Sequence, residues 1–142
     1  MLKILLIEDN SGYIALTVEA FKETRTPNEL YFVEDGQKAM DYLRRQGSYA
    51  LSQRPDIILL DLNLPKKDGR QVLKEIKSDP QLKRIPVVVL TTSKDDEDLR
   101  EAYDNYANCY IRKPRDLEGF LEVVKKVEDF WLSLVELPEN SG

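Results

Sequence analysis

The sequence predicts an α/β domain built on a doubly wound, five-stranded parallel sheet. Five short apolar segments alternate with five helical patterns along the chain, and they lie at residues 3–7, 30–33, 57–60, 85–90 and 109–112. The segment at 57–60 is a continuous apolar run, which is typical of a strand covered on both faces. Regular alternation of strand and helix favours parallel strands joined by right-handed crossovers, with helices on both faces of the sheet.

The first part of the chain contains two strands and two helices. Residues 3–7 form an apolar strand that ends at the acid pair Glu8-Asp9, which suits a turn and a helix start. Apolar residues at positions 14, 18 and 21 predict an amphipathic helix that ends near Pro27. Residues 30–33 form the second strand, and a second helix follows that ends at Arg44-Arg45, where cations complement the helix dipole.

A longer connection at residues 46–55 leads into the apolar run at 57–60, which ends on Asp61. A third helix follows Gly69 and ends before Pro80. Residues 85–90 form a β-branched fourth strand. The helix after this strand begins in an acidic group and has one apolar side, formed by Leu99, Ala102, Tyr103 and Tyr106.

The last strand, at residues 109–112, ends on Lys113-Pro114. The final helix has apolar residues at steps of four and three from Phe120 to Leu134, and it ends at Pro138. We therefore expect one domain over residues 1–137 and a flexible C-terminal tail at 138–142. The chain has 142 residues, a length that fits one domain.

Composition excludes several classes of protein. The sequence is 42% hydrophobic and 33% charged, which is typical of a globular domain, and no apolar run approaches the ~20 residues of a spanning helix. Acids interrupt the first apolar segment at once, unlike a signal peptide, so we expect a cytoplasmic protein with no membrane partner. The formal charge of −5 argues against direct binding of nucleic acid.

The numbers of cysteine and histidine residues limit the reactions and metal sites that this chain can support. Cys109 is the only cysteine, which excludes an intrachain disulfide and a cysteine zinc site. The chain has no histidine, which excludes a Ser-His-Asp or Cys-His nucleophile, an HExxH metal site and a phosphohistidine. Any reaction must therefore depend on carboxylates, hydroxyls, lysine and a hard metal ion.

Polar residues gather where the strands end. The carboxyl ends of parallel strands share one edge of the sheet, and ligands bind at that edge in open α/β sheets. The residues there are Glu8, Asp9, Asp61, Thr91 and Lys113. Each has an ordinary structural explanation, such as a helix cap, a cap on the turn begun by Pro65, a strand former or a solvated cation. Their joint occurrence favours a site.

Three crowded carboxylates repel one another unless a cation joins them, and oxygen ligands of this kind suit Mg²⁺. A carboxylate can also attack phosphorus, and charge neutralisation then carries much of the transfer. The sequence therefore predicts a magnesium-dependent site for phosphoryl chemistry.

On these residues the chain resembles a CheY-like receiver domain, the response regulator of two-component signalling, from Lys3 to about Leu134. The joint pattern is Glu8-Asp9, Asp61 with Pro65 four residues on, Thr91 and Lys113-Pro114. The resemblance implies a flavodoxin-like (βα)5 fold with strand order 2-1-3-4-5. It also implies that Asp61 accepts a phosphoryl group from the phosphohistidine of a sensor histidine kinase.

The same resemblance assigns roles at the site. Asp9 matches a direct Mg²⁺ ligand, Glu8 an acid that acts through water, and the backbone carbonyl of Asn63 a further ligand beside Asp61. Lys113 matches the lysine that pairs with the phosphoryl oxygens, and the Lys113-Pro114 bond matches one that is usually cis. Thr91 and Tyr110 match the hydroxyl and the inward-turning aromatic of the switch. The alternative for Tyr110 is a half-buried strand tyrosine.

More closely, the chain resembles stand-alone regulators that are paired with phytochrome-like sensor kinases. The resemblance lies in residues 62–70 and 86–93, the long connection before Asp56, and Phe130-Trp131-Leu132. Two positions depart from the family: Thr92 stands where alanine is common, and Arg115 where an aromatic is common. These departures bear on switching and on the lifetime of the phosphoryl group.

The apolar stripe of the last helix continues through Trp131, Leu134 and Leu137. It either folds back on its own domain or forms an interface, and we favour a homodimer.

The leading hypothesis is a phosphorylation-dependent switch without an output domain, which acts by dimerisation, by binding a downstream protein or by relaying the phosphoryl group. Its only catalysis would be self-phosphorylation and self-dephosphorylation.

A competing hypothesis is a magnesium-dependent phosphohydrolase, but Asn63 stands where haloacid dehalogenase-like enzymes have the second aspartate of Asp-x-Asp. A third hypothesis is an interaction module whose acidic site is vestigial. A dinucleotide-binding protein is disfavoured because no G-x-G-x-x-G follows the first strand.

Overall fold

The computed structural model describes residues 1–24 and 26–138, except for the side chains of Ser133 and Leu134. Its five strands form one sheet in the order β2-β1-β3-β4-β5, and every neighbouring pair is parallel. The strands are β1 (Leu2–Ile7), β2 (Asn28–Val33), β3 (Ile57–Leu60), β4 (Val87–Thr91) and β5 (Cys109–Arg112). The flavodoxin-like topology that the resemblance implied is confirmed.

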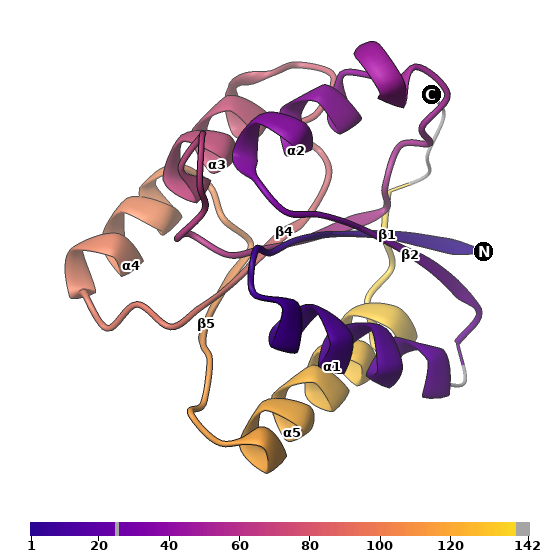
Figure 1. Cartoon of the computed structure of the whole chain (residues 1–142), viewed down its shortest axis with the longest axis vertical. Coiled ribbons are helices and arrows are strands. Elements are labelled where there is room, and N and C mark those ends of the chain that lie inside the picture. Colours follow the sequence, from indigo (N-terminus) through magenta and orange to yellow (C-terminus); the bar gives the residue numbers. More distant parts are fainter. Residues whose placement is uncertain (25, 139–142) are drawn as a thin grey trace.

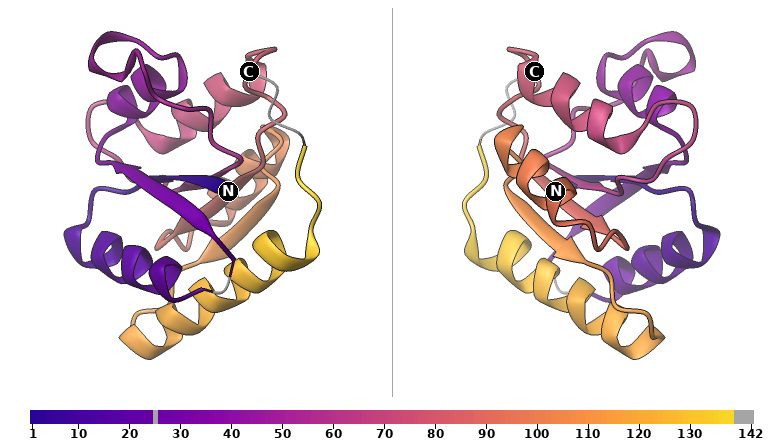
Figure 2. Two further views of the ribbon diagram at one scale, coloured as in Figure 1. Left: turned by 90° about the vertical axis from the view of Figure 1, so that its right-hand side faces the viewer. Right: turned by 90° about the vertical axis from the view of Figure 1, so that its left-hand side faces the viewer.

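Helices cover both faces of this sheet (Figures 1 and 2). They are α1 (Ser11–Glu23), α2 (Gly36–Leu43), α3 (Gly69–Ser78), α4 (Asp96–Asp104) and α5 (Leu117–Glu128), with a short 3₁₀ turn at Gly47–Tyr49. Residues of α1 and α5 pack on one face of the sheet, and residues of α2, α3 and α4 pack on the other. The doubly wound arrangement follows from this division.

The alternation of side chains along each strand explains why there are two cores. On β1, Leu5 and Ile7 face α2 and α3, whereas Ile4 and Leu6 face α1 and α5. On β3 all four residues are buried, because each of its faces is covered. The unbroken apolar run of the sequence is therefore the central strand.

Aspartate or asparagine begins every α-helix. The side chain of the residue before the helix accepts a backbone N–H of the first turn in each case, at Asn10, Asp35, Asp68, Asp95 and Asp116. Each such cap is typically worth ~1 kcal/mol. Four of the 26 acidic residues of the chain therefore serve as helix caps.

The helix α4 differs from expectation. Only Asp98 and Ala102 of α4 are buried, whereas Tyr103 and Tyr106 are 49% and 75% exposed. The helix ends at Asp104, and Tyr106 has a φ of 67°, which turns the chain away so that Ala107 donates its N–H to the carbonyl of Ala102. The apolar side predicted to include both tyrosines was therefore wrong.

The C-terminal part of the last helix also differs. The α-helix ends at Glu128, and Asp129–Leu134 form a π-helix, so the spacing of four and three does not continue as regular α-helix. Trp131 and Leu132 are half-buried against the core beneath α1 and α5. Of the tail predicted at 138–142, residues 139–142 lie outside the described part.

No peptide bond of the described residues is cis, so the expectation of a cis Lys113-Pro114 bond was wrong. The trans form of an X-Pro bond is favoured by about 0.5–1 kcal/mol, and the identity of the residues does not decide the isomer. Among the described residues, we find no helix with the length and apolar character that crossing a bilayer requires.

Candidate functional site

The backbone brings the predicted residues to one edge of the sheet. Glu8 donates its N–H to the carbonyl of Val33, Asp61 donates to Ile7, and Lys113 donates to Thr91, at 3.1, 3.0 and 2.7 Å. These bonds extend the parallel ladder just past the ends of β1, β3 and β5. The first residues after these strands are thereby held in register, and their side chains share the edge.

Three carboxylates meet there. Oxygen atoms of Glu8, Asp9 and Asp61 lie within 4.8 Å of one another. Glu8 and Asp61 are 3% and 7% exposed, whereas Asp9 is exposed. This set of oxygen donors, open on one side, fits a hard divalent cation such as Mg²⁺, which binds a few carboxylates and keeps several waters. The predicted grouping of the three acids is confirmed.

Lys113 is the buried cation of the site. Its Nζ forms an ion pair with Oε1 of Glu8 and lies 3.5 Å from Oδ2 of Asp61 and 4.2 Å from the ring centroid of Tyr13. The side chain is 2% exposed. Burying an unpaired ammonium would be costly, so the two carboxylates and the ring together make this position tolerable.

Glu8 gives the site an unusual protonation equilibrium. Burial raises the pKa of Glu8 to about 7, the charge of Lys113 opposes that rise, and Asp61 adds to it. A buried carboxylate beside another carboxylate resists ionisation unless a cation is near. The protonation of Glu8 therefore depends on the charges of Lys113 and Asp61 beside it.

Thr91 and Asn63 complete the edge. Thr91 is fully buried at the end of β4, and its Oγ1 accepts the backbone N–H of Ser93 at 3.3 Å. Asn63 is exposed, and its N–H donates to Oδ1 of Asp61 at 3.3 Å. The backbone N–H of Asn63 thus lies beside the Asp61 carboxylate, and the role of the Asn63 carbonyl as a cation ligand stays a prediction.

Comparison with known proteins now decides the family. The model of the response regulator receiver domain matches residues 4–125. The chain belongs to the receiver domain family. Response regulator Rcp1 of Synechocystis sp. is 50% identical over 135 residues, which are 95% of this chain and 92% of Rcp1.

Two solved structures are also similar. A crystal structure of Mn²⁺-bound Rcp1 has a TM-score of 0.96 and 49% identity, and the match covers 98% of this chain and 100% of that one. A structure of the phosphorylated cyanobacterial phytochrome response regulator RcpA has a TM-score of 0.94 and 55% identity, with coverage of 96% and 98%. The chain is a response regulator receiver domain, a signalling protein rather than a metabolic enzyme.

In this receiver domain, glycines hold the β3–α3 loop (residues 61–68) in place. A Cβ on Gly69 would lie 2.2 Å from the carbonyl oxygen of Asp61, and a Cβ on Gly36 would lie 1.8 Å from the carbonyl oxygen of Lys67. The N–H of Gly69 also donates to Leu62 at 2.9 Å. Only glycine allows α2 and α3 to approach this loop so closely.

Tyr110 of the receiver domain lies half-buried on β5, against the core shared by α2, α3 and α4. Its hydroxyl is buried and has no hydrogen-bond partner among the described residues. Burial raises the pKa of Tyr110, and the nearby Ser93 hydroxyl lowers it. The predicted switch tyrosine is thus within reach of the segment that follows Thr91.

Sequence reasoning missed one polar network. Arg70 donates to both oxygens of Asp98, from Nε to Oδ1 at 2.7 Å and from Nη2 to Oδ2 at 2.6 Å. Ser93 donates its hydroxyl to Oδ2 of Asp98 at 2.7 Å. The two charges are 28 residues apart in the chain. A single sequence carries no signal for that pairing, because Arg70 and Asp98 each suit an exposed helix position.

Asp98 should make the stability of the protein depend on pH. Hydrogen bonds from Arg70 lower the pKa of Asp98 from 3.8 to about 2, although burial opposes the shift. A depressed pKa stabilises the folded state above pH ~4, and this stabilisation is lost as the pH falls through ~2. We expect Asp98→Asn to lower the free energy of unfolding, measured in urea, by on the order of 1–2 kcal/mol near neutral pH. The difference in this free energy between the variant and the wild type should shrink below pH ~4. A difference that stays constant with pH would contradict the pairing.

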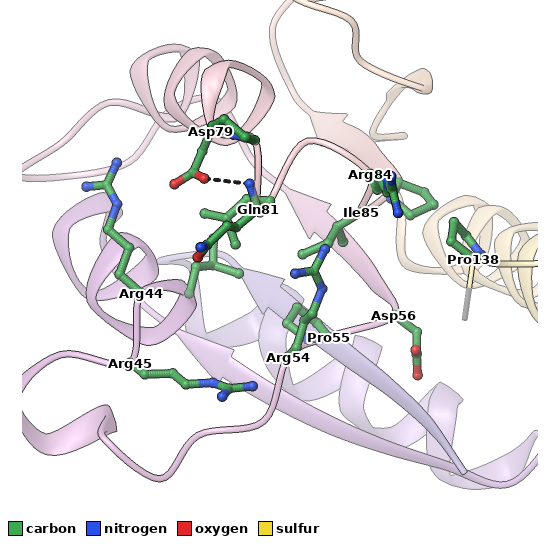
Figure 3. A pocket seen from close by; sticks show the side chains of 14 residues that line it. Arg44, Arg45, Arg54, Pro55, Asp56, Asp79, Gln81, Arg84, Ile85 and Pro138 are labelled. Atoms are coloured by element: carbon green, nitrogen blue, oxygen red, sulfur yellow. Dashed lines mark hydrogen bonds between the residues drawn. The ribbon is translucent and has the colours of Figure 1, made fainter. Parts of the chain in front are cut away.

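A hollow of the structure lies away from the acidic site. It has a volume of about 590 Å³ and opens near the starts of β3 and β4, at the opposite edge of the sheet. Figure 3 shows four arginines around it, Arg44, Arg45, Arg54 and Arg84. No residue of the acidic site lines this hollow, so it is separate from the carboxylate chemistry.

Proposed function

We propose that Asp61 is the phosphoryl acceptor of this receiver domain and that its donor is the phosphohistidine of a sensor histidine kinase. The observation that carries the proposal is the position of the Asp61 carboxylate, which lies beside Glu8 and Asp9 and 3.5 Å from Nζ of Lys113. The chain has no histidine, so a phosphohistidine donor must belong to another protein.

The transfer needs little from the chain beyond position and charge. An oxygen of the Asp61 carboxylate attacks phosphorus, and the bond from phosphorus to the imidazole nitrogen of the donor breaks. The electron pair of that bond stays on the nitrogen, so a donor ring that carries a proton on its other nitrogen leaves as neutral imidazole. Lys113 attracts the phosphoryl oxygens, and the hydroxyl of Thr91 is the nearby donor on β4. A bound Mg²⁺, held by Glu8, Asp9, Asp61 and the carbonyl of Asn63, supplies further neutralisation of negative charge.

Two similar proteins, Rcp1 and RcpA, support the proposed metal site and the proposed kinase partner. Rcp1 has been solved in a Mn²⁺-bound form, and RcpA is a phosphorylated cyanobacterial phytochrome response regulator. By extension, the partner of this chain is a phytochrome-like sensor kinase in the cytoplasm. The receiver then removes its own phosphoryl group by hydrolysis, and its output is dimerisation, binding of a downstream protein or relay of the phosphoryl group.

The dimer proposal concerns the C-terminal surface. Leu117 of α5 and Phe130 of the π-helix are 62% and 52% exposed, and Phe130 packs edge-on against Trp131 at 5.5 Å between ring centroids. Exposed aliphatic and aromatic side chains on α5 and on the π-helix that continues it favour an interface between copies. Sizing chromatography of the wild type and Phe130→Ser, with and without phosphorylation, tests this. Elution of all four samples at the volume of a monomer would exclude the dimer.

Within the proposal, Thr91 and Tyr110 form the switch, in which movement of the Thr91 hydroxyl toward the phosphoryl group lets Tyr110 turn inward. The unpartnered hydroxyl of Tyr110 costs stability in the present state. We therefore expect Tyr110→Phe to raise the free energy of unfolding of the unphosphorylated protein by about 1 kcal/mol, measured in urea. A loss of 1 kcal/mol or more would show that the hydroxyl already has a partner.

The function is tested by intact mass. The protein is incubated with Mg²⁺ and acetyl phosphate, a small donor that needs no kinase, and a parallel sample contains EDTA. A single phosphoryl adduct that depends on Mg²⁺ supports the proposal. A folded protein that gains no adduct would instead favour an interaction module with a vestigial site.

A further inference from the structure

A polar network outside the carboxylate site connects the two segments that the proposed reaction uses. We name Arg70, Asp98 and Ser93 the α3–α4 clamp. Arg70 lies in the first turn of α3, Asp98 in α4, and Ser93 between β4 and α4. All three bonds of the clamp are 2.7 Å or shorter, and the Arg70–Asp98 pair is bidentate. Bidentate bonds between arginine and carboxylate are among the strongest polar contacts in proteins.

The clamp is sheltered from solvent, so it is stronger than an exposed pair. The side chains of Asp98 and Arg70 are 11% and 29% exposed. By contrast, the pair formed by Asp96 of the same helix with Arg112 is 76% and 44% exposed, at 2.9 Å. Exposed pairs contribute little, whereas removal of one partner from a sheltered pair leaves the other charge without compensation.

One end of the clamp is tied to the β3–α3 loop that carries Asp61. Nη1 of Arg70 donates to the carbonyl of Leu62 at 3.4 Å and to both oxygens of Asp68 at 3.0 and 3.1 Å. Leu62 directly follows Asp61 in the chain. The guanidinium therefore links the start of the acceptor loop to α4.

The other end is tied to Thr91. Ser93 donates its hydroxyl to Asp98, and its backbone N–H donates to Oγ1 of Thr91. Ser93 cannot follow Thr91 toward Asp61 while its hydroxyl holds the Asp98 carboxylate, unless α4 moves as well. The clamp thus opposes displacement of the Thr91 hydroxyl.

We propose that Arg70 and Asp98 are positioning residues that hold Ser93, and through it the hydroxyl of Thr91, in the resting arrangement and so restrain phosphoryl uptake on Asp61. The inference rests on the proposed function. Opening the clamp breaks the Ser93–Asp98 bond and frees the segment that follows Thr91.

The hydroxyl of Tyr110 is buried and has no hydrogen-bond partner among the described residues. Burial raises the pKa of Tyr110 most, the Ser93 side chain lowers this pKa, and the charge of Asp98 raises it. Release of Ser93 from Asp98 would therefore change the surroundings of the proposed switch tyrosine.

The test measures the first-order rate of adduct formation at Asp61 with acetyl phosphate and Mg²⁺. Five proteins are compared: wild type, Asp98→Asn, Ser93→Ala, the double variant that carries both of these changes, and Asp96→Asn. We expect Ser93→Ala to accelerate uptake about tenfold, because it removes the bond that the moving segment must break. Asp98→Asn should also accelerate uptake, because an amide oxygen accepts the Ser93 hydroxyl more weakly than a carboxylate does. The double variant should be no faster than the faster single variant, because both changes release the same step.

Asp96→Asn is the matched control, because it removes a carboxylate and an ion pair from the same helix without touching Ser93. Its rate should equal that of the wild type. Ser93→Ala leaves the Arg70–Asp98 pair intact, so the inference stays testable if Asp98→Asn destabilises the fold in urea. The proposed role of the clamp would be overturned if Ser93→Ala took up the phosphoryl group within twofold of the wild-type rate. It would also be overturned if Asp96→Asn were accelerated as much as Ser93→Ala. If no protein of the set gains an adduct, the proposed function itself fails.

Discussion

Phosphoryl uptake is expected to vanish in Asp61→Asn, while the protein stays folded. The amide has nearly the shape of the carboxylate but is not a nucleophile toward phosphorus. Removing one negative charge also relieves the repulsion among the three acids, one of which already has its pKa raised to about 7. The free energy of unfolding without metal should therefore stay the same or rise by about 1 kcal/mol.

Intact mass and urea unfolding measure the two effects on the same samples. Asp104→Asn is the control, because Asp104 is an exposed carboxylate at the end of α4, away from the site. It should keep both the adduct and the stability of the wild type. An adduct that persists in Asp61→Asn would show that another group accepts the phosphoryl.

The second large effect is expected at Gly69. In Gly69→Ala the new methyl group would lie 2.2 Å from the carbonyl oxygen of Asp61 and 2.6 Å from Cα of Leu62. Both are backbone atoms, so no side-chain rotation relieves the clash, and α3 must move away from the loop. We expect a loss of about 2–4 kcal/mol in the free energy of unfolding, and slower phosphoryl uptake because the loop that carries Asp61 shifts.

Gly12→Ala is the matched control. A Cβ there meets only the side-chain oxygen of Asn10, at 3.2 Å, and Gly12 lies in the first turn of α1, where alanine favours helix. Its effect in urea unfolding should stay within about 1 kcal/mol. Equal stabilities of Gly69→Ala and the wild type would mean that α3 does not pack against the loop as the structure shows.

The parallel sheet could be predicted from the sequence, and so could the grouping of the polar residues that follow its strands, because both depend on local sequence patterns. The apolar run at 57–60 needs cover on both faces, and alternation with helices favours a parallel sheet, whose strands bring Glu8, Asp61 and Lys113 to a single edge in any strand order. The structure confirms this grouping. The chemical roles of these residues stay predictions that the experiments above test.

Features that depend on contacts between distant residues could not be predicted. Arg70 and Asp98 are ordinary surface residues until the fold brings their helices together. The exposed Tyr106 has the spacing of a core residue, but a left-handed backbone takes it out of the helix. The π-helix at Asp129–Leu134 has the same apolar spacing as an α-helix over its short length, so periodicity alone does not distinguish them.

The most direct test of the central claim locates the phosphoryl group within the chain. The protein is phosphorylated with acetyl phosphate and Mg²⁺ and then reduced with borohydride, which converts an aspartyl phosphate to homoserine, and peptide masses identify the converted residue. The structure predicts conversion at Asp61 alone. Conversion at Glu8, Asp9 or any other acid, with Asp61 intact, would contradict the assignment of the acceptor.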